Sequence, residues 1–118
     1  MRDEDRIRLR HMPEAARQAL AFAAGKSRAD LDASRQLVLA LVKLVEIVGE
    51  AASQVSRDAQ QEVPSVPWRD MVAMRRRLVH AYFDINLDVV WSTVVTDLPA
   101  LIGALETVPG LAEEPPAE

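Results

Sequence analysis

One short stretch of the sequence concentrates side chains that could do chemistry on a phosphate group. It contains Arg69, Arg75, Arg76, Arg77 and His80. The imidazole of histidine titrates near neutral pH and can therefore accept or donate a proton under physiological conditions. The guanidinium of arginine is planar and binds a phosphate through two parallel hydrogen bonds. The stretch is therefore a candidate site for a reaction at a phosphodiester.

Two of these residues have the properties that metal-free RNA cleavage requires. His80 fits the general base that removes the proton from the ribose 2′-hydroxyl, which then attacks the adjacent phosphorus. Arg75 fits the cation that stabilises the negative charge developing on the phosphate oxygens. Arg76 and Arg69 are candidate contacts to the RNA backbone. DNA lacks the 2′-hydroxyl, so this chemistry would select RNA.

A structural interpretation of the same residues stays open. A single histidine near a helix end is commonly a surface or capping residue, and Arg75 could pair with Glu46 or Glu50 of another helix. On one straight helix, a spacing of five residues also separates Arg75 from His80 by about 140°. The reach of the arginine, a helix that ends near His80, or a second subunit must close that gap.

The periodicity of apolar residues predicts an all-α fold without strands. No segment shows sustained period-two alternation, whereas helical spacing is evident in four stretches. Pro13 predicts a kink or a late start in the first helix. A turn is expected at residues 84–86, and the fourth helix is expected to break near 97–99. The four predicted helices cover residues 3–24, 30–57, 66–82 and 87–108.

The second predicted helix has an apolar arc that covers more than half of its circumference. Such an arc exceeds what one side of a small bundle needs, so this helix is either central in the fold or partly in contact with another subunit. Gly49 in its middle costs about 1 kcal/mol relative to Ala. A close approach of another backbone at Gly49 is therefore expected.

Composition excludes several other classes of protein. The 118 residues include no Cys, and the two histidines, His11 and His80, are far apart, so no metal site or cofactor is expected. A net charge of −4 argues against non-specific coating of nucleic acid. The charged N-terminus and the short apolar run at 37–48 predict a cytoplasmic protein without a membrane association. One domain over residues 1–110 and a disordered tail over 111–118 are expected.

The candidate stretch resembles a known family signature. From Trp68 to Asn86 the sequence reads WRDMVAMRRRLVHAYFDIN, similar to the pattern W-x-x-I-x-G-M-R-N-x-L-x-H-x-Y-F-x-I-D of HepT-like toxins in the HEPN superfamily. Upstream, residues 45–52 are similar to the family's E-I-I-G-E-A-A. Downstream, residues 90–91 and 97–99 match its V-W and D-L-P. The resemblance thus extends over essentially the whole chain.

This resemblance implies an antiparallel HEPN-like bundle of four to five helices that forms a homodimer. In the family, the R-x-x-x-x-H motifs of both subunits meet in a shared cleft and act as a metal-independent endoribonuclease on cellular RNA, tRNA in some members. The matching positions are Arg75 and His80. The family tyrosine matches Tyr82, which implies AMPylation by a partner antitoxin, a minimal nucleotidyltransferase.

The sequence departs from the family pattern at two positions of the motif. Arg76 replaces an Asn and Ala73 replaces a Gly, which leaves altered or lost catalysis as a possibility. One alternative function is a non-catalytic helical module that binds a nucleotide or a partner and regulates a nucleotidyltransferase. Another is a dimeric scaffold without a partner enzyme.

Overall fold

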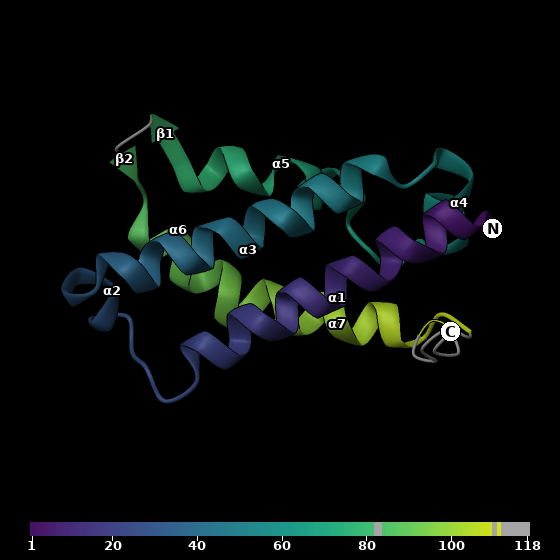
Figure 1. Cartoon of the computed structure of the whole chain (residues 1–118). Helices are drawn as coiled ribbons and strands as arrows, with labels where there is room; N and C mark the ends of the chain where they lie inside the picture. Colours follow the sequence, from purple (N-terminus) through teal and green to yellow (C-terminus); the bar gives the residue numbers. More distant parts are fainter. Residues whose placement is uncertain (82–83, 110, 112–118) are drawn as a thin grey trace.

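Four long helical segments run alternately up and down the molecule (Figure 1). The apolar periodicity predicts four helices, and the family resemblance implies their antiparallel order. The computed structural model describes residues 1–81, 84–109 and 111. For residues 75 and 79–81 it describes the backbone alone. Most of the described part is helical, so the all-α class is confirmed, although two short strands were not expected. The long segments are α1 (Asp3–Ala23), α3 (Arg35–Gln54), α5 (Trp68–Leu78) and a last run of α6 (Leu87–Ser92), η1 (Thr93–Asp97) and α7 (Leu98–Glu106).

Two serines alter the predicted second helix: Ser34 divides it into two helices, and Ser56 ends it at the start of a short helix that was not predicted. The Ser34 side chain accepts a hydrogen bond from the Leu37 amide (3.2 Å) and caps α3, which separates it from the short α2 (Asp30–Ala33). Ser56 caps α4 (Arg57–Glu62) in the same way through the Ala59 amide. A serine oxygen satisfies amides that a helix leaves unpaired at its start. These capped starts explain why one long periodic pattern becomes separate helices.

The helix α3 is central in the fold and packs against both α1 and α5. Its wide apolar arc is therefore mostly used inside one subunit, with Leu41, Val45 and Val48 fully buried. A Cβ atom built on Gly49 would lie 3.1 Å from the backbone oxygen of Met71 in α5. The predicted close backbone approach at Gly49 is confirmed.

The prediction of a third helix reaching residue 82 is wrong. The helix α5 ends at Leu78, and the chain continues as β1 (Val79–Ala81), which pairs antiparallel with β2 (Asp84–Ile85). Strands of two and three residues are too short to produce a visible alternation in the sequence. The reversal is closed by the Asn86 amide, which donates to the Leu78 carbonyl at 2.7 Å.

The first and last predicted helices differ from expectation in detail. The helix α1 starts at Asp3 despite Pro13, which is buried within it, so the alternative of a late start is wrong. The last run does not break at 97–99 but widens into the π-helical turn η1. Pro99 lies in the first turn of α7.

Within the described residues, the segment Leu87–Glu106 is long and apolar enough to cross a membrane by length and composition alone. Its mean hydropathy is 1.3, and 28 % of the apolar window is buried. One side of this segment carries a row of fully or almost fully buried side chains. They are Val90, Val94, Leu98, Leu101 and Leu105.

Candidate active site

The two motif residues lie on either side of the end of α5. The backbone of Arg75 belongs to the last turn of α5, and that of His80 belongs to β1. Because α5 ends at Leu78, the helical angle of about 140° no longer applies to this pair. A helix that ends near His80 is observed, and the reach of the arginine and a second subunit stay open as further ways to bring the two residues together.

His80 occupies an irregular position in the β1–β2 hairpin. The backbone pairs Val79 with Ile85 and Ala81 with Asp84, and the register shifts between Val79 and Ala81. His80 is therefore the extra residue at a bulge. Bulges redirect a side chain and are common beside active sites.

Two of the arginines share one face of α5 and a third does not. Arg69 and Arg76 are both exposed, and a spacing of seven residues places them on the same side of a helix, two turns apart. Arg77 donates to the carbonyl of Asp70 (3.4 Å) and lies about 100° further round the helix. The structure thus brings Arg69 and Arg76 together and leaves Arg77 apart.

Part of the predicted site lies outside the described residues. This holds for Tyr82 and for the side chains of Arg75 and His80. The pairing of Arg75 with Glu46 or Glu50 therefore remains an alternative. Of residues 111–118, predicted to be a tail, Leu111 alone is described, and it is buried.

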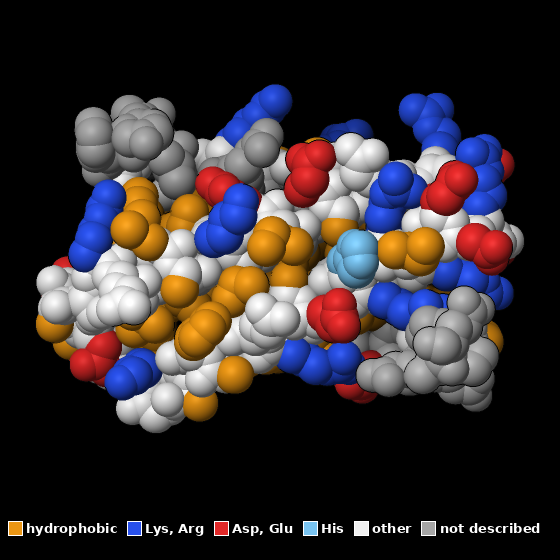
Figure 2. Space-filling model, in the orientation of Figure 1, with side chains coloured by type: hydrophobic (Ala, Val, Ile, Leu, Met, Phe, Trp, Pro, Cys, Tyr) orange, Lys and Arg blue, Asp and Glu red, His pale blue; other side chains and the backbone are white. Residues whose placement is uncertain are grey.

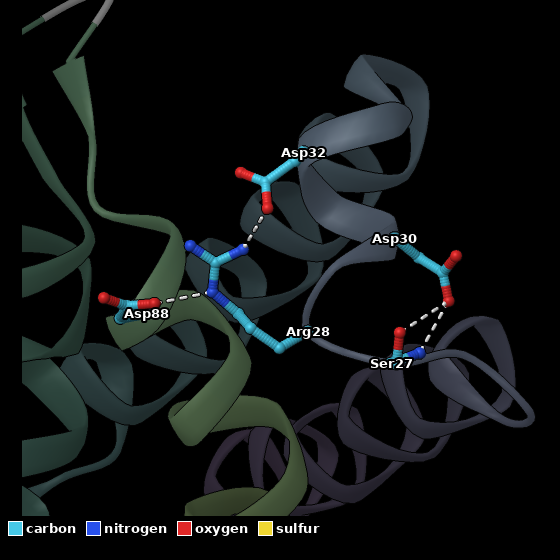
Figure 3. A network of polar contacts seen from close by, with 5 residues as sticks. All are labelled: Ser27, Arg28, Asp30, Asp32 and Asp88. Atoms are coloured by element: carbon cyan, nitrogen blue, oxygen red, sulfur yellow. Dashed lines mark hydrogen bonds and ion pairs between the residues drawn. The ribbon is translucent and has the colours of Figure 1, made fainter.

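A polar network beside the hairpin was not predicted from the sequence (Figure 3). Arg28, in the α1–α2 connection, donates from Nε to Asp88 of α6 at 2.6 Å and from Nη1 to Asp32 of α2 at 3.1 Å. The hydrogen bond that Arg28 donates to Asp88 is the largest cause of a pKa of Arg28 above its ordinary value, and desolvation by burial opposes it. Arg28 and Asp88 are 60 residues apart in the sequence, so no local pattern marks them as partners.

The described residues contain no cluster of three or more His, Cys, Asp or Glu that could hold a metal ion. The chain places one imidazole and several guanidinium groups on α5 and β1. These groups can transfer a proton and bind a phosphate.

Comparison with known proteins agrees with the motif. The family model described as "Ribonuclease HepT-like" matches residues 12–108. "Probable ribonuclease HepT" of Thermococcus cleftensis is 38 % identical over 77 residues, which are 65 % of this chain and 70 % of the relative. A protein of Methanocaldococcus jannaschii that is named as an RNase is 33 % identical over 75 residues, 64 % of this chain and 69 % of the relative.

A third relative, from Caldanaerobacter subterraneus and also named as an RNase, is 34 % identical over 65 residues, 55 % of this chain and 58 % of its own length. No solved structure matches the chain. The fold and the matched proteins define a helical ribonuclease. The chain belongs to the HepT-like ribonuclease family.

Proposed function

We propose that this ribonuclease is the toxin of a toxin–antitoxin pair and a metal-independent endoribonuclease that cleaves cellular RNA in the cytoplasm. His80 is its general base and acid, and Arg75 stabilises the pentacoordinate phosphorus. The observation that carries this proposal is the family match over residues 12–108, which includes both positions. The end of α5 between them supports it, because both residues belong to the same end of the bundle.

The proposed reaction needs only groups of the chain and of the RNA. His80 takes the proton of the 2′-hydroxyl, whose oxygen forms a bond to the adjacent phosphorus. The bond from phosphorus to the 5′-oxygen breaks, and the protonated His80 returns a proton to that oxygen. Arg75 stabilises the charge on the non-bridging oxygens. The products are a 2′,3′-cyclic phosphate and a free 5′-hydroxyl.

The proposed RNA contacts are the two exposed arginines on the outer side of α5. Arg69 and Arg76 form a positive face that leads toward the end of the helix where Arg75 lies. Phosphate contacts by arginine position the RNA without selecting its sequence. Their part in the proposal is to hold the backbone while His80 and Arg75 act.

A homodimer is the second part of the proposal. Hydrophobic side chains gather over the visible face of α1 and α3 (Figure 2). On these two helices, Phe22 is 52 %, Leu39 49 % and Ile47 37 % exposed. Exposed apolar residues on neighbouring helices are typical of contact surfaces. The end of α1 and the start of α3 lie at the same end of the bundle as β1 and β2 (Figure 1). A second copy on this face would bring two motifs near each other.

AMPylation of Tyr82 by a nucleotidyltransferase antitoxin is the proposed control of the enzyme. The family pattern supports it, because Tyr82 follows His80 by two residues. An added adenylate would bring phosphate charge close to the groups that bind the RNA phosphate and would repel the substrate. Intact mass after co-expression with the partner is expected to rise in adenylate steps for the native chain and not for Tyr82→Phe.

The deciding experiment compares RNA cleavage and growth inhibition by the native chain, His80→Ala and Arg75→Ala. Each variant is expected to lose at least about 100-fold in cleavage rate, the usual contribution of a general base or of a charge-stabilising group. Arg57→Ala is the control, since Arg57 is exposed on α4, away from the end of α5 and from the proposed dimer surface, and its loss is expected to leave activity unchanged. Intact RNA and normal growth with the native chain would instead favour the non-catalytic module that regulates a nucleotidyltransferase.

A further inference from the structure

The salt bridge between Arg28 and Asp88 anchors the exit of the β1–β2 hairpin. We infer that Arg28 is a positioning residue of this ribonuclease: it holds Asp88 and so fixes the hairpin that carries His80. The inference rests on the proposed role of His80. Arg28 lies in the α1–α2 connection, far from the motif in sequence, and would act on the site through the hairpin.

The hairpin cannot hold its own position. It contains two backbone pairs, Val79 with Ile85 and Ala81 with Asp84, and an isolated two-stranded hairpin is marginally stable at best. Its placement therefore depends on what holds its two ends. The entrance is fixed because Leu78 is fully buried.

The exit is held by three hydrogen bonds, two local ones at Asn86 and one from the distant Arg28. The Asn86 amide donates to the Leu78 carbonyl at 2.7 Å and closes the base of the hairpin. The Asn86 side chain accepts from the Val89 amide at 3.1 Å and caps α6. The third is the 2.6 Å contact from Arg28 to Asp88. Among the ion pairs of the described residues, this is the one that ties α6 to another element.

Two neighbouring contacts fix the position of Arg28 and direct its side chain toward Asp88 (Figure 3). Both the amide and the hydroxyl of Ser27 donate to Asp30, at 2.6 and 3.2 Å, and fix the connection that precedes α2. Asp32 holds a second edge of the Arg28 guanidinium at 3.1 Å. A planar guanidinium bridges two carboxylates in a defined direction, which the ammonium group of lysine does not reproduce.

Two single variants separate a positioning role from a role in RNA binding. Arg28→Ala and Asp88→Asn break the same contact but change the net charge in opposite directions. A positioning role predicts that both lower kcat by roughly fivefold, the order expected when one exposed ion pair stops aligning a catalytic group. A role in RNA binding predicts opposite changes in KM, because RNA affinity rises with positive charge. That second result, with kcat unchanged, would overturn the inference.

The matched control is Arg17→Ala. Arg17 also forms an exposed ion pair between two helices, with Glu106 of α7 at 3.3 Å, and this pair does not involve the hairpin. Its loss is expected to leave kcat unchanged. Arg28→Lys keeps a cation near Asp88 and is expected to recover part of the activity that Arg28→Ala loses. The unfolding midpoint should change little in all four variants, since exposed pairs contribute little to stability.

Amide hydrogen exchange tests the positioning step without any RNA. Peptides that cover β1, β2 and the start of α6 are expected to exchange several times faster in Arg28→Ala and in Asp88→Asn, and at the native rate in Arg17→Ala. Unchanged exchange in both variants would overturn the inference even if the chain cleaves RNA. Faster exchange in a chain that cleaves no RNA would instead count against the proposed ribonuclease mechanism and leave the anchor standing.

Discussion

At the scale of single residues, Asp5 links the start of the chain to the cap of another helix. Its side chain is 3 % exposed and accepts from the amide (2.8 Å) and the hydroxyl (2.7 Å) of Ser56. The backbone hydrogen bond from Ser56 is the largest cause of a pKa below the ordinary value of 3.8, and burial opposes it. Because Ser56 also caps α4, Asp5 stabilises the contact between α1 and α4.

The lowered pKa of Asp5 predicts a specific dependence of stability on pH. The folded state favours the ionised carboxylate, so its contribution is full above pH 3.8 and is lost as pH falls through the lower value in the folded protein. Asp5→Ala is expected to lower the free energy of unfolding by about 2 kcal/mol at neutral pH. Urea denaturation should show a smaller difference from the native chain at about pH 3. An equal difference at both pH values would contradict the role of the charge.

Arg76 is the residue that departs from the family motif, and it is exposed on the outer face of α5. Arg76→Asn, which restores the family residue, is expected to weaken RNA binding several-fold and to reduce the slope of log affinity against log salt by about one. Titration of a labelled RNA at several salt concentrations measures both. The control is Arg77→Asn, because Arg77 donates to the Asp70 carbonyl on another side of α5. A slope unchanged by Arg76→Asn would remove this residue from the RNA contact.

At the scale of elements, the distance between α3 and α5 is set at Gly49. A side chain there would press on the backbone oxygen of Met71, which is 3.1 Å from the position of the added Cβ. Gly49→Ala is expected to lower the free energy of unfolding by about 1 kcal/mol, because the contact outweighs the gain of about 1 kcal/mol in helix propensity. Thermal unfolding measures the change.

Gly103 in α7 provides the matched comparison for Gly49. A Cβ at Gly103 meets nothing within 4 Å, so Gly103→Ala is expected to raise the free energy of unfolding by about 1 kcal/mol through helix propensity alone. Opposite signs for the two substitutions would establish that α5 is held close to α3 by the absence of a side chain. Equal stabilisation by both would show that the contact at Met71 relaxes without cost.

For the whole molecule, the proposed dimer predicts that one active site contains residues of two protomers. The apolar residues Phe22, Leu39 and Ile47 are exposed on α1 and α3, and the proposed dimer covers them. Leu39→Glu combined with Ile47→Glu is expected to convert the dimer to a monomer in sedimentation equilibrium and to abolish RNA cleavage. Val95→Glu is the control, since Val95 is 41 % exposed in η1, outside the proposed surface. A native chain that sediments as a monomer would contradict the dimer.

Mixing two inactive variants tests the shared site directly. A heterodimer of Arg75→Ala and His80→Ala holds one intact Arg75 and one intact His80, on different protomers. If the two protomers share a site, each heterodimer holds one intact site of two, and half of the dimers are heterodimers after random exchange of an equal mixture. The mixture is therefore expected to regain about a quarter of the native rate. If each protomer acts alone, no activity returns.

Local patterns in the sequence determined the helices, their order and the residues that match the ribonuclease motif. Apolar spacing follows from the period of the helix. It predicted the positions of the four long helical segments to within a few residues, except at the capped breaks, where the error was larger. The close approach at Gly49 was also predictable, because a glycine in a helix interior lowers helix stability and a close packing contact can offset that loss. These features depend on neighbours in sequence, so the sequence alone reveals them.

Features that depend on contacts between distant segments were decided by the tertiary structure. The end of α5 at Leu78, and with it the transfer of His80 from a helix to a strand, depends on the pairing of β1 with β2 and on the Asn86 hydrogen bond to Leu78. The ties from Arg28 to Asp88 and from Asp5 to Ser56 join residues 60 and 51 positions apart. The sequence around a charged or polar side chain is the same whether water or a distant residue forms its hydrogen bonds. The packing of the helices therefore determines these contacts.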